Sequence, residues 1–237
     1  MINNISAFTI NNPVFVRIKK KFNWAKLTYE QSVKAVYINE RIIELPFVIQ
    51  GLAGLKRGGK VLDVGCSESI LPMQLAGLGY AVTGLDFRYY PFHFPGLGSC
   101  QSDATKMPFE NGSFDAVTCV SMLEHVGIGH YDDPWHDDSG DTKVMGEIAR
   151  VLQKDGLILL TVPFGVPTQG SLQRTYDPKR LEKILSGWRV EEKRYFINAQ
   201  DKGALNDHWQ ECDEAKAATM NSVDKTVCVC LLKARRS

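Results

Sequence analysis

Three carboxylates stand at the ends of short apolar runs that are typical of buried strands. Asp63 lies near the end of the run 61–64, Asp86 closes the run 81–85, and Asp103 follows the run 97–101. The carboxyl ends of parallel strands meet at one edge of a sheet, where open α/β sheets bind their ligands. Because carboxylates are negatively charged and accept hydrogen bonds, an acid at this edge suits a cationic or amine-bearing ligand.

A second group with chemical potential is the pair Glu124-His125, which follows the apolar run 114–120 and Ser121. Histidine has an ordinary pKa of about 6.5 and can take a proton from a hydroxyl group as that group attacks. The adjacent carboxylate could orient the imidazole or raise its basicity. The same pair could instead only cap or pack the junction between a strand and a helix, and the sequence leaves both alternatives open.

The segment 130–141 combines five aspartates and two histidines with no basic residue. Oxygen and imidazole ligands suit magnesium or manganese, which makes Asp132, Asp133 and His136 candidate metal ligands. Alternatively, these acids bind the hydroxyl groups of a glycan on which Trp135 stacks, or they form a solvated loop in which Asp141 caps the next helix. We expect no bound metal, although a loop of this length favours some function.

The elements that must position these residues centre on the stretch 60–86, which predicts a strand, a turn at Gly65, a helix at about 70–78 and a second strand. This is one βαβ unit of the kind that binds a nucleoside. A dinucleotide site needs the pattern G-x-G-x-x-G after the first strand. Here the turn holds one glycine and the acidic Glu68, which would repel a pyrophosphate. The turn therefore disfavours an NAD-dependent dehydrogenase.

The rest of the chain predicts further elements around this unit. We expect strands at 97–101, 114–120, 157–163, 188–197 and 226–233, and helices at 28–45, 47–55, 142–153, 179–185 and 213–220. Pro46 is expected to separate the first two helices. The polar stretch 198–222 is interpreted as an insertion that either helps to form the acceptor pocket or covers a sheet edge.

The sequence Asp63-Val64-Gly65-Cys66, followed further on by Asp86, resembles motifs I and II of the class I S-adenosylmethionine (SAM) methyltransferases. The chain is similar to the type 11-like group of that family. The resemblance implies SAM as the cofactor. It also implies an α/β, Rossmann-like doubly wound fold, with a seven-stranded sheet in the order 3-2-1-4-5-7-6, an antiparallel last strand and helices on both faces.

The resemblance also implies roles for individual residues. In this family the acid after the second strand holds the ribose and the acid after the third holds the adenine, which assigns these roles to Asp86 and Asp103. Phe87 either stacks on the adenine or packs between helix and sheet. The other residues expected at the cofactor or the acceptor are Asp63, Gly65, Cys66 and Ser67 at the methionine end, then Ala104, Ser121, Tyr37, Arg41, Gln173, Arg174 and Tyr176.

The stretch from Ser121 to Val126 resembles motif IV of the family, without the Asn/Asp-Pro-Pro-aromatic sequence of enzymes that methylate amines in DNA. This favours methyl transfer to oxygen or carbon, or to an amine of a small molecule. The segment 124–176 also resembles a bacterial subgroup linked to polysaccharide and secondary-metabolite pathways. We therefore expect an enzyme that methylates a hydroxyl group of a sugar, glycolipid or other small metabolite, with His125 as the base. The alternative is a non-catalytic SAM-fold scaffold protein at a membrane-associated glycan assembly.

Composition bounds these hypotheses. The chain has 237 residues and a net charge of +1, which offers no electrostatic case for a nucleic-acid partner. Six cysteines without metal-ligand spacing predict reduced thiols and a cytoplasmic protein. Neither a signal peptide nor a membrane-spanning run is expected. Residues 1–25 are interpreted as an arm whose basic and aromatic side chains face solvent or weakly contact an anionic membrane surface, and residues 26–237 as the methyltransferase domain. The oligomeric state is left open.

Overall fold

The computed structural model describes residues 39–236 except 68, 130–135, 169, 171–172, 200–207 and 223–225. The expected arm at 1–25 lies outside the described residues, as do Tyr37, Asp132 and Asp133. The boundary that we expect at residue 25 therefore stays a prediction.

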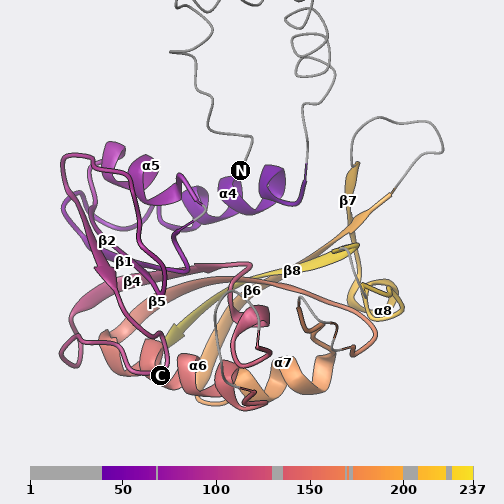
Figure 1. Cartoon of the computed structure of the whole chain (residues 1–237). Coiled ribbons are helices and arrows are strands. Elements are labelled where there is room, and N and C mark those ends of the chain that lie inside the picture. Colours follow the sequence, from indigo (N-terminus) through magenta and orange to yellow (C-terminus); the bar gives the residue numbers. More distant parts are fainter. Residues whose placement is uncertain are drawn as a thin grey trace, which may run out of the picture.

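A single sheet of eight strands forms the centre of the described chain, in the order β3-β2-β1-β4-β5-β8-β6-β7 (Figure 1). The strands are β1 (Lys60–Val64), β2 (Ala81–Asp86), β3 (Leu97–Gln101), β4 (Phe114–Val120), β5 (Leu152–Pro163), β6 (Trp188–Asn198), β7 (Trp209–Cys212) and β8 (Cys228–Arg236). Neighbours from β3 to β5 pair in parallel, whereas β8 runs antiparallel to both β5 and β6.

This topology confirms the predicted fold class, and the count of seven strands is wrong by one. The additional strand is β7, which comes from the polar insertion at 198–222 and pairs antiparallel with β6 at the sheet edge. Its two middle residues are exposed and its two end residues are half-buried, so it carries no apolar run that would mark it as a strand. The insertion thus covers a sheet edge, and within the described residues it contributes nothing to the main cavity.

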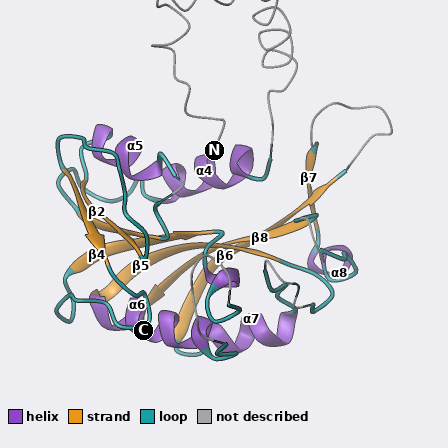
Figure 2. Cartoon of the chain, viewed as in Figure 1, coloured by secondary structure: helices purple, strands orange, loops and turns teal. Residues whose placement is uncertain are grey.

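Helices cover both faces of the sheet (Figure 2). On one face lie α4 (Arg41–Gly51) and α5 (Leu71–Gly77), and on the other lie α6 (Gly140–Val151) and α7 (Pro178–Ile184). The short helix α8 (Glu214–Ala217) packs beside β6. Each face has its own hydrophobic core, so the central strands β1, β4 and β5 are buried on both sides, as their continuous apolar runs predict.

Three element boundaries differ from the prediction. Helix α4 continues through Pro46, although proline removes one backbone donor from a helix interior. The burial of the apolar side chains of Phe47 and Val48 offsets this loss. Helix α6 begins at Gly140 with Ser139 as its N-cap residue, so Asp141 lies in the first turn and does not cap the helix. Strand β5 begins at residue 152, and its pairing with β4 is irregular in register near this start.

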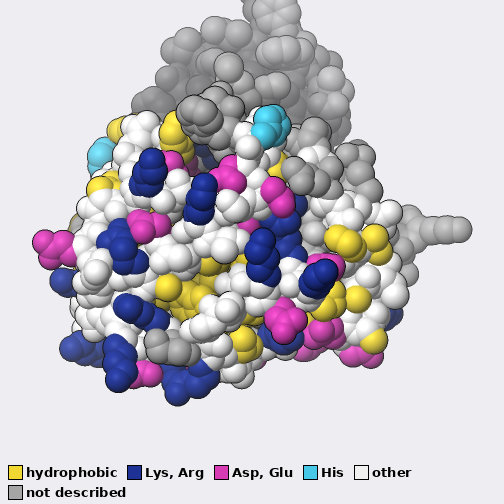
Figure 3. All heavy atoms as spheres, turned by 90° about the horizontal axis from the view of Figure 1, so that it is seen from below, with side chains coloured by type: hydrophobic (Ala, Val, Ile, Leu, Met, Phe, Trp, Pro, Cys, Tyr) yellow, Lys and Arg dark blue, Asp and Glu magenta, His cyan; other side chains and the backbone are white. Residues whose placement is uncertain are grey.

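The face seen in Figure 3 carries lysine, arginine and acidic side chains interspersed with one another. No stretch of one charge dominates this face, which agrees with the small net charge. No helix among the described residues is both long and apolar enough to cross a membrane.

Candidate functional site

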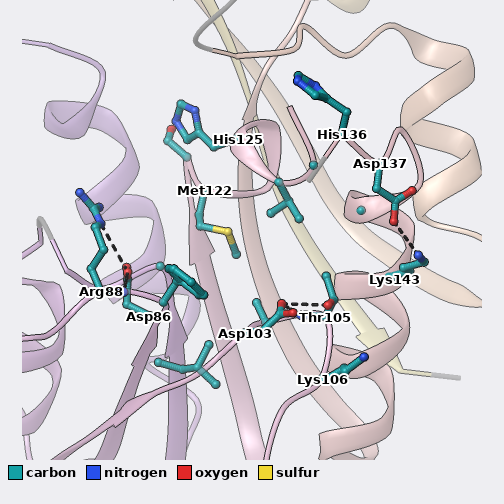
Figure 4. Close-up of a pocket in the computed structure, with 18 of the residues that line it drawn as sticks. Asp86, Arg88, Asp103, Thr105, Lys106, Met122, His125, His136, Asp137 and Lys143 are labelled. Carbon is teal, nitrogen blue, oxygen red and sulfur yellow. Dashed lines mark hydrogen bonds and ion pairs between the residues drawn. The ribbon is translucent and has the colours of Figure 1, made fainter. Parts of the chain in front are cut away.

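A cavity of about 540 Å³ opens at the carboxyl ends of the parallel strands (Figure 4). A volume of this size fits a small organic ligand. The cavity has two sides, which come from different parts of the chain. The residues that end or follow β1, β2 and β3 form what we call the strand wall: Gly65, Asp86, Phe87, Asp103 and Ala104. His125, Gly127, His136, Asp137 and Lys143 form what we call the loop wall.

Backbone amides hold the two acids of the strand wall. Asp86 is largely buried, and its Oδ2 and Oδ1 accept hydrogen bonds from the amides of Ser67 (2.9 Å) and Arg88 (2.8 Å). Asp103 is exposed, and its Oδ1 accepts from the amide and the hydroxyl of Thr105 at 2.7 and 2.8 Å. A carboxylate has about four acceptor positions, so each acid retains capacity for a ligand.

The turn after β1 depends on its one glycine. Gly65 has a φ of 87°, a conformation that strongly favours glycine. A Cβ atom at this position would overlap the side chain of Met122, which also lines the cavity. Gly65 therefore lets the strand wall approach the segment that follows β4.

The structure does not bring every predicted cofactor residue to the cavity surface. Asp63 is buried behind the strand wall, where it accepts a 2.5 Å hydrogen bond from Thr118, and burial raises the pKa of Asp63 to about 7. The thiol of Cys66 packs toward Gly84, and burial raises its pKa strongly. Ser67 contributes its amide to Asp86, not a side chain to the cavity. Direct cofactor contacts from these three side chains stay predictions.

Glu124 and His125 lie in a short 3-10 helix (η1, Leu123–His125) after β4. His125 lines the cavity, while Glu124 is buried and does not. Glu124 Oε1 lies 3.9 Å from His125 Nε2, which is too long for a hydrogen bond. Burial raises the pKa of Glu124 to about 8, so this acid is mostly protonated at neutral pH. The predicted interaction between a charged Glu124 carboxylate and the His125 imidazole is therefore weak in this geometry.

The loop wall is held by side-chain ion pairs. Lys143 reaches Asp137 at 2.5 Å. Beneath this wall, the buried carboxylate of Asp141 accepts hydrogen bonds from Arg180 Nε at 2.8 Å and from the Tyr176 hydroxyl at 3.2 Å. Arg174 is also buried, with its Nη1 3.6 Å from Asp141 Oδ2. Of the predicted acceptor residues, Gln173, Arg174 and Tyr176 thus lie outside the cavity surface, and the last two support the loop wall.

Sequence reasoning missed Glu44, whose side chain links the two expected cavity residues Arg41 and Ser121. Both of these line the cavity as expected. A signal for Glu44 existed, because it is the one acid on the apolar face that includes Phe47 and Val48. The predicted helix break at Pro46 hid this pattern. The cavity residues Lys106 and Lys143 belonged to no recognisable motif, and Met122 lay in the motif IV stretch without being singled out.

No group of three or more potential metal ligands occurs within the described parts of the chain. Of the three candidate ligands, His136 lies on the cavity surface. Because the other two lie outside the described residues, the metal hypothesis stays untested.

Comparisons with known proteins identify the kind of domain that contains this cavity. Residues 62–160 match a family described as a methyltransferase domain. The predicted methyltransferase domain is thereby confirmed for these residues, and the strand order together with the solved structures described below confirms the Rossmann-like fold.

Among curated relatives, a ubiquinone biosynthesis O-methyltransferase from Colwellia psychrerythraea is 26% identical over 174 residues. The aligned part covers 69% of this chain and 65% of that relative, so the chain spans just under two thirds of the relative's length.

Two solved structures share the fold at 14% identity. A SAM-dependent methyltransferase from Methanosarcina mazei has a TM-score of 0.56, with 80% of this chain and 96% of that chain covered. The Burkholderia thailandensis 1,6-didemethyltoxoflavin-N1-methyltransferase, solved with S-adenosylhomocysteine, has a TM-score of 0.55, with 93% and 87% covered.

Proposed function

We propose that this chain transfers a methyl group from SAM to a hydroxyl oxygen of a small metabolite. The observation that carries the proposal is the cavity itself, which gathers Asp86, Asp103 and His125 from three separate stretches of the methyltransferase domain. The curated relative supports oxygen as the acceptor atom, because it is named as an O-methyltransferase.

The strand wall fits SAM by its donor and acceptor chemistry. Asp86 retains acceptor positions for the two ribose hydroxyls, and Asp103 Oδ2 can accept from the adenine amine. The guanidinium of Arg41, at the same cavity, suits the carboxylate of the methionine end. SAM, when bound, supplies a methyl group on a positively charged sulfur, which a nucleophile can take while the sulfur keeps the bonding electron pair.

His125 supplies the base in this proposal. A hydroxyl group is a weak nucleophile until it loses its proton, and a ring nitrogen of His125 at the cavity surface can take that proton. The neighbouring Glu124 is then a buried, mostly protonated residue of η1 and not a charged partner of the imidazole.

The class of acceptor is also part of the proposal. We infer a hydroxyl-bearing metabolite such as a sugar or glycolipid, which rests on the sequence resemblance alone. A hydroxylated intermediate of the kind handled by the ubiquinone-pathway relative is the alternative. We likewise propose a cytoplasmic enzyme that takes a small-molecule or glycan acceptor and no nucleic acid, with weak membrane contact through residues 1–25.

Calorimetric titration with SAM tests the cofactor half of the proposal. The wild type is expected to bind, and Asp86→Ala is expected to weaken binding by about 100-fold, since it removes two charged hydrogen bonds. Asp115→Asn is the matched control, because Asp115 accepts a hydrogen bond from Lys60 at the opposite ends of the strands. Absence of binding by the wild type, or equal binding by Asp86→Ala, would contradict the proposal.

Transfer of labelled methyl groups to a panel of hydroxylated acceptors tests the catalytic half. His125→Ala should lose turnover by about 100-fold, as expected for removal of a general base, with SAM affinity little changed. His93→Ala is the control, because His93 is exposed and lies outside the cavity. Full turnover in His125→Ala rejects the base, and a wild type that binds SAM but methylates nothing favours the scaffold alternative.

A further inference from the structure

Glu44 is a fully buried carboxylate that ties helix α4 to the ends of two strands. Its Oε1 accepts hydrogen bonds from the hydroxyls of Ser121 and Thr161, both at 2.6 Å. Its Oε2 accepts from Nη1 of Arg41 at 2.7 Å. A buried charge is costly unless it is paired and hydrogen-bonded. The three hydrogen bonds meet this requirement for Glu44, whose carboxylate is fully buried.

Two of the three partners of Glu44 reach the cavity from different elements. Arg41 comes from the first turn of α4, and Ser121 directly follows β4. Ser121 has a φ of 43°, which is uncommon for a residue with a side chain. Its hydroxyl bond to Glu44 and its amide bond to Thr161 Oγ1, at 3.0 Å, stabilise this backbone conformation.

The bond to Glu44 also fixes how Arg41 presents its charge. The guanidinium is planar and has five donor hydrogens, of which Glu44 takes one. Burial alone would lower the pKa of Arg41, but the charge and hydrogen bond of Glu44 raise it above its ordinary value. Arg41 is therefore a fixed cation with donors that remain for a planar anion such as a carboxylate.

We propose that Glu44 is a positioning residue. It holds Arg41 in place to bind the amino-acid end of the cofactor, and it fixes Ser121 at the cavity surface beside Arg41. The inference rests on the proposed use of SAM, and it assigns to α4 a part of the site that lies outside the matched domain at 62–160. Glu44 itself does not touch the cavity; it acts through Arg41 and Ser121.

The isosteric variant Glu44→Gln distinguishes the bond to Arg41 from the bonds to Ser121 and Thr161. A glutamine oxygen can still accept from Ser121 and Thr161, but its NH₂ group cannot accept from Arg41. We compare two probes by calorimetry: S-adenosylhomocysteine, and 5′-methylthioadenosine, which has the same nucleoside and sulfur without the amino-acid group. Glu44→Gln should weaken S-adenosylhomocysteine binding by about tenfold and leave 5′-methylthioadenosine binding within about twofold.

A double-mutant cycle tests whether Glu44 acts through Arg41. In the Arg41→Ala background, Glu44→Gln should cause no further loss of S-adenosylhomocysteine affinity. The matched control is Glu211→Gln, which breaks a similar glutamate–arginine pair with Arg194 on β6 and β7, away from the cavity. If Glu44→Gln does not fold, Glu44→Asp carries the same comparison, because it keeps the buried charge but shortens its reach toward Arg41.

The outcomes distinguish the inference from the proposed function. A wild type that binds neither probe contradicts the use of SAM. A wild type that binds both, with equal weakening of both probes in Glu44→Gln, shows that Glu44 is merely structural. Unchanged binding of both probes, or losses that simply add in the double variant, also overturns the positioning role.

Discussion

The strand wall and the loop wall of the cavity differ in what holds their side chains. Backbone amides at the ends of strands fix Asp86 and Asp103. Side-chain ion pairs, such as Lys143 with Asp137, fix the loop wall. The position of a backbone amide changes only when the path of the chain changes, whereas one substitution removes a side-chain ion pair. Under the proposed function, we expect cofactor binding to depend on the backbone of the strand wall and acceptor choice to depend on the exchangeable side chains of the loop wall.

The largest effect is expected from changing the backbone of the strand wall. Gly65→Ala places a Cβ at a φ of 87° and against Met122. Strain and overpacking of this kind cost about 1–3 kcal/mol each, so thermal unfolding should shift markedly downward and SAM binding should be lost.

Gly146→Ala is the matched control for that change. Gly146 lies exposed in α6 with open space around its Cβ position, so alanine should raise helix stability by up to about 1 kcal/mol. If Gly65→Ala binds SAM as the wild type does, the strand wall does not depend on its backbone and the comparison fails.

The next effect concerns the buried acid behind the loop wall. The pKa of Glu124 is raised from 4.5 in ordinary surroundings to about 8, so the folded state keeps a proton that the unfolded state loses between these values. The free energy of unfolding should therefore fall as pH rises through this window, by up to about 1.4 kcal/mol per pH unit from this group. Asp63, with its pKa raised to about 7, acts in the same direction.

Glu124→Gln tests this by copying the protonated form. Between pH 5 and 9, the melting temperature of the variant should rise relative to that of the wild type as pH increases. Turnover of the variant at pH 7 should be largely retained. Glu110→Gln, in an exposed turn, should follow the wild type at every pH. A constant difference between Glu124→Gln and the wild type would show that Glu124 is ionised throughout.

A smaller effect is expected where an ion pair supports the loop wall. Arg180→Met removes a charged hydrogen bond from the buried Asp141, which should cost about 2 kcal/mol, with Arg174 and Tyr176 left as partial support. Melting temperature should fall and the acceptor KM should rise, while SAM affinity measured by calorimetry stays within about twofold. A tenfold loss of SAM affinity would mean that the two walls are not independent.

The smallest effect belongs to the loop-wall surface. Lys143 is largely exposed, so its pair with Asp137 should contribute less than about 1 kcal/mol to stability. Lys143→Gln should leave melting temperature and SAM affinity unchanged and alter only the acceptor KM. A shift in SAM affinity without a shift in acceptor KM would reverse the assignment of the two walls.

The same contrast explains what could be predicted from the sequence. Asp86, Asp103 and Gly65 were predictable because parallel strands bring their carboxyl ends to one edge whatever the surface sequence. Asp63 was expected in the site and lies behind it, because its side chain turns toward Thr118 on the neighbouring strand β4. Strand ends can be recognised in a sequence, but the direction of one side chain at a strand end depends on its cross-strand neighbour.

The loop wall and α4 were less predictable for a different reason. Lys143 and Asp137 meet through the path of a loop, which leaves no periodic pattern in the sequence. Glu44 depends on α4 continuing past Pro46, against the local preference of proline. Tertiary packing of Phe47 and Val48 decides that helix, and packing partners distant in sequence are not visible in the local pattern.

The position of β8 has a consequence for how the chain folds. The pair β6–β7 precedes β8 in sequence but reaches the rest of the sheet only through it, since β8 lies between β5 and β6. Two of the eight strands of the described sheet can therefore join the others only after β8, which is synthesised later, has paired with β5. These contacts join segments far apart in the chain. Folding is expected to be slow at this step, with the inner edge of β5 open for pairing with other chains until β8 arrives.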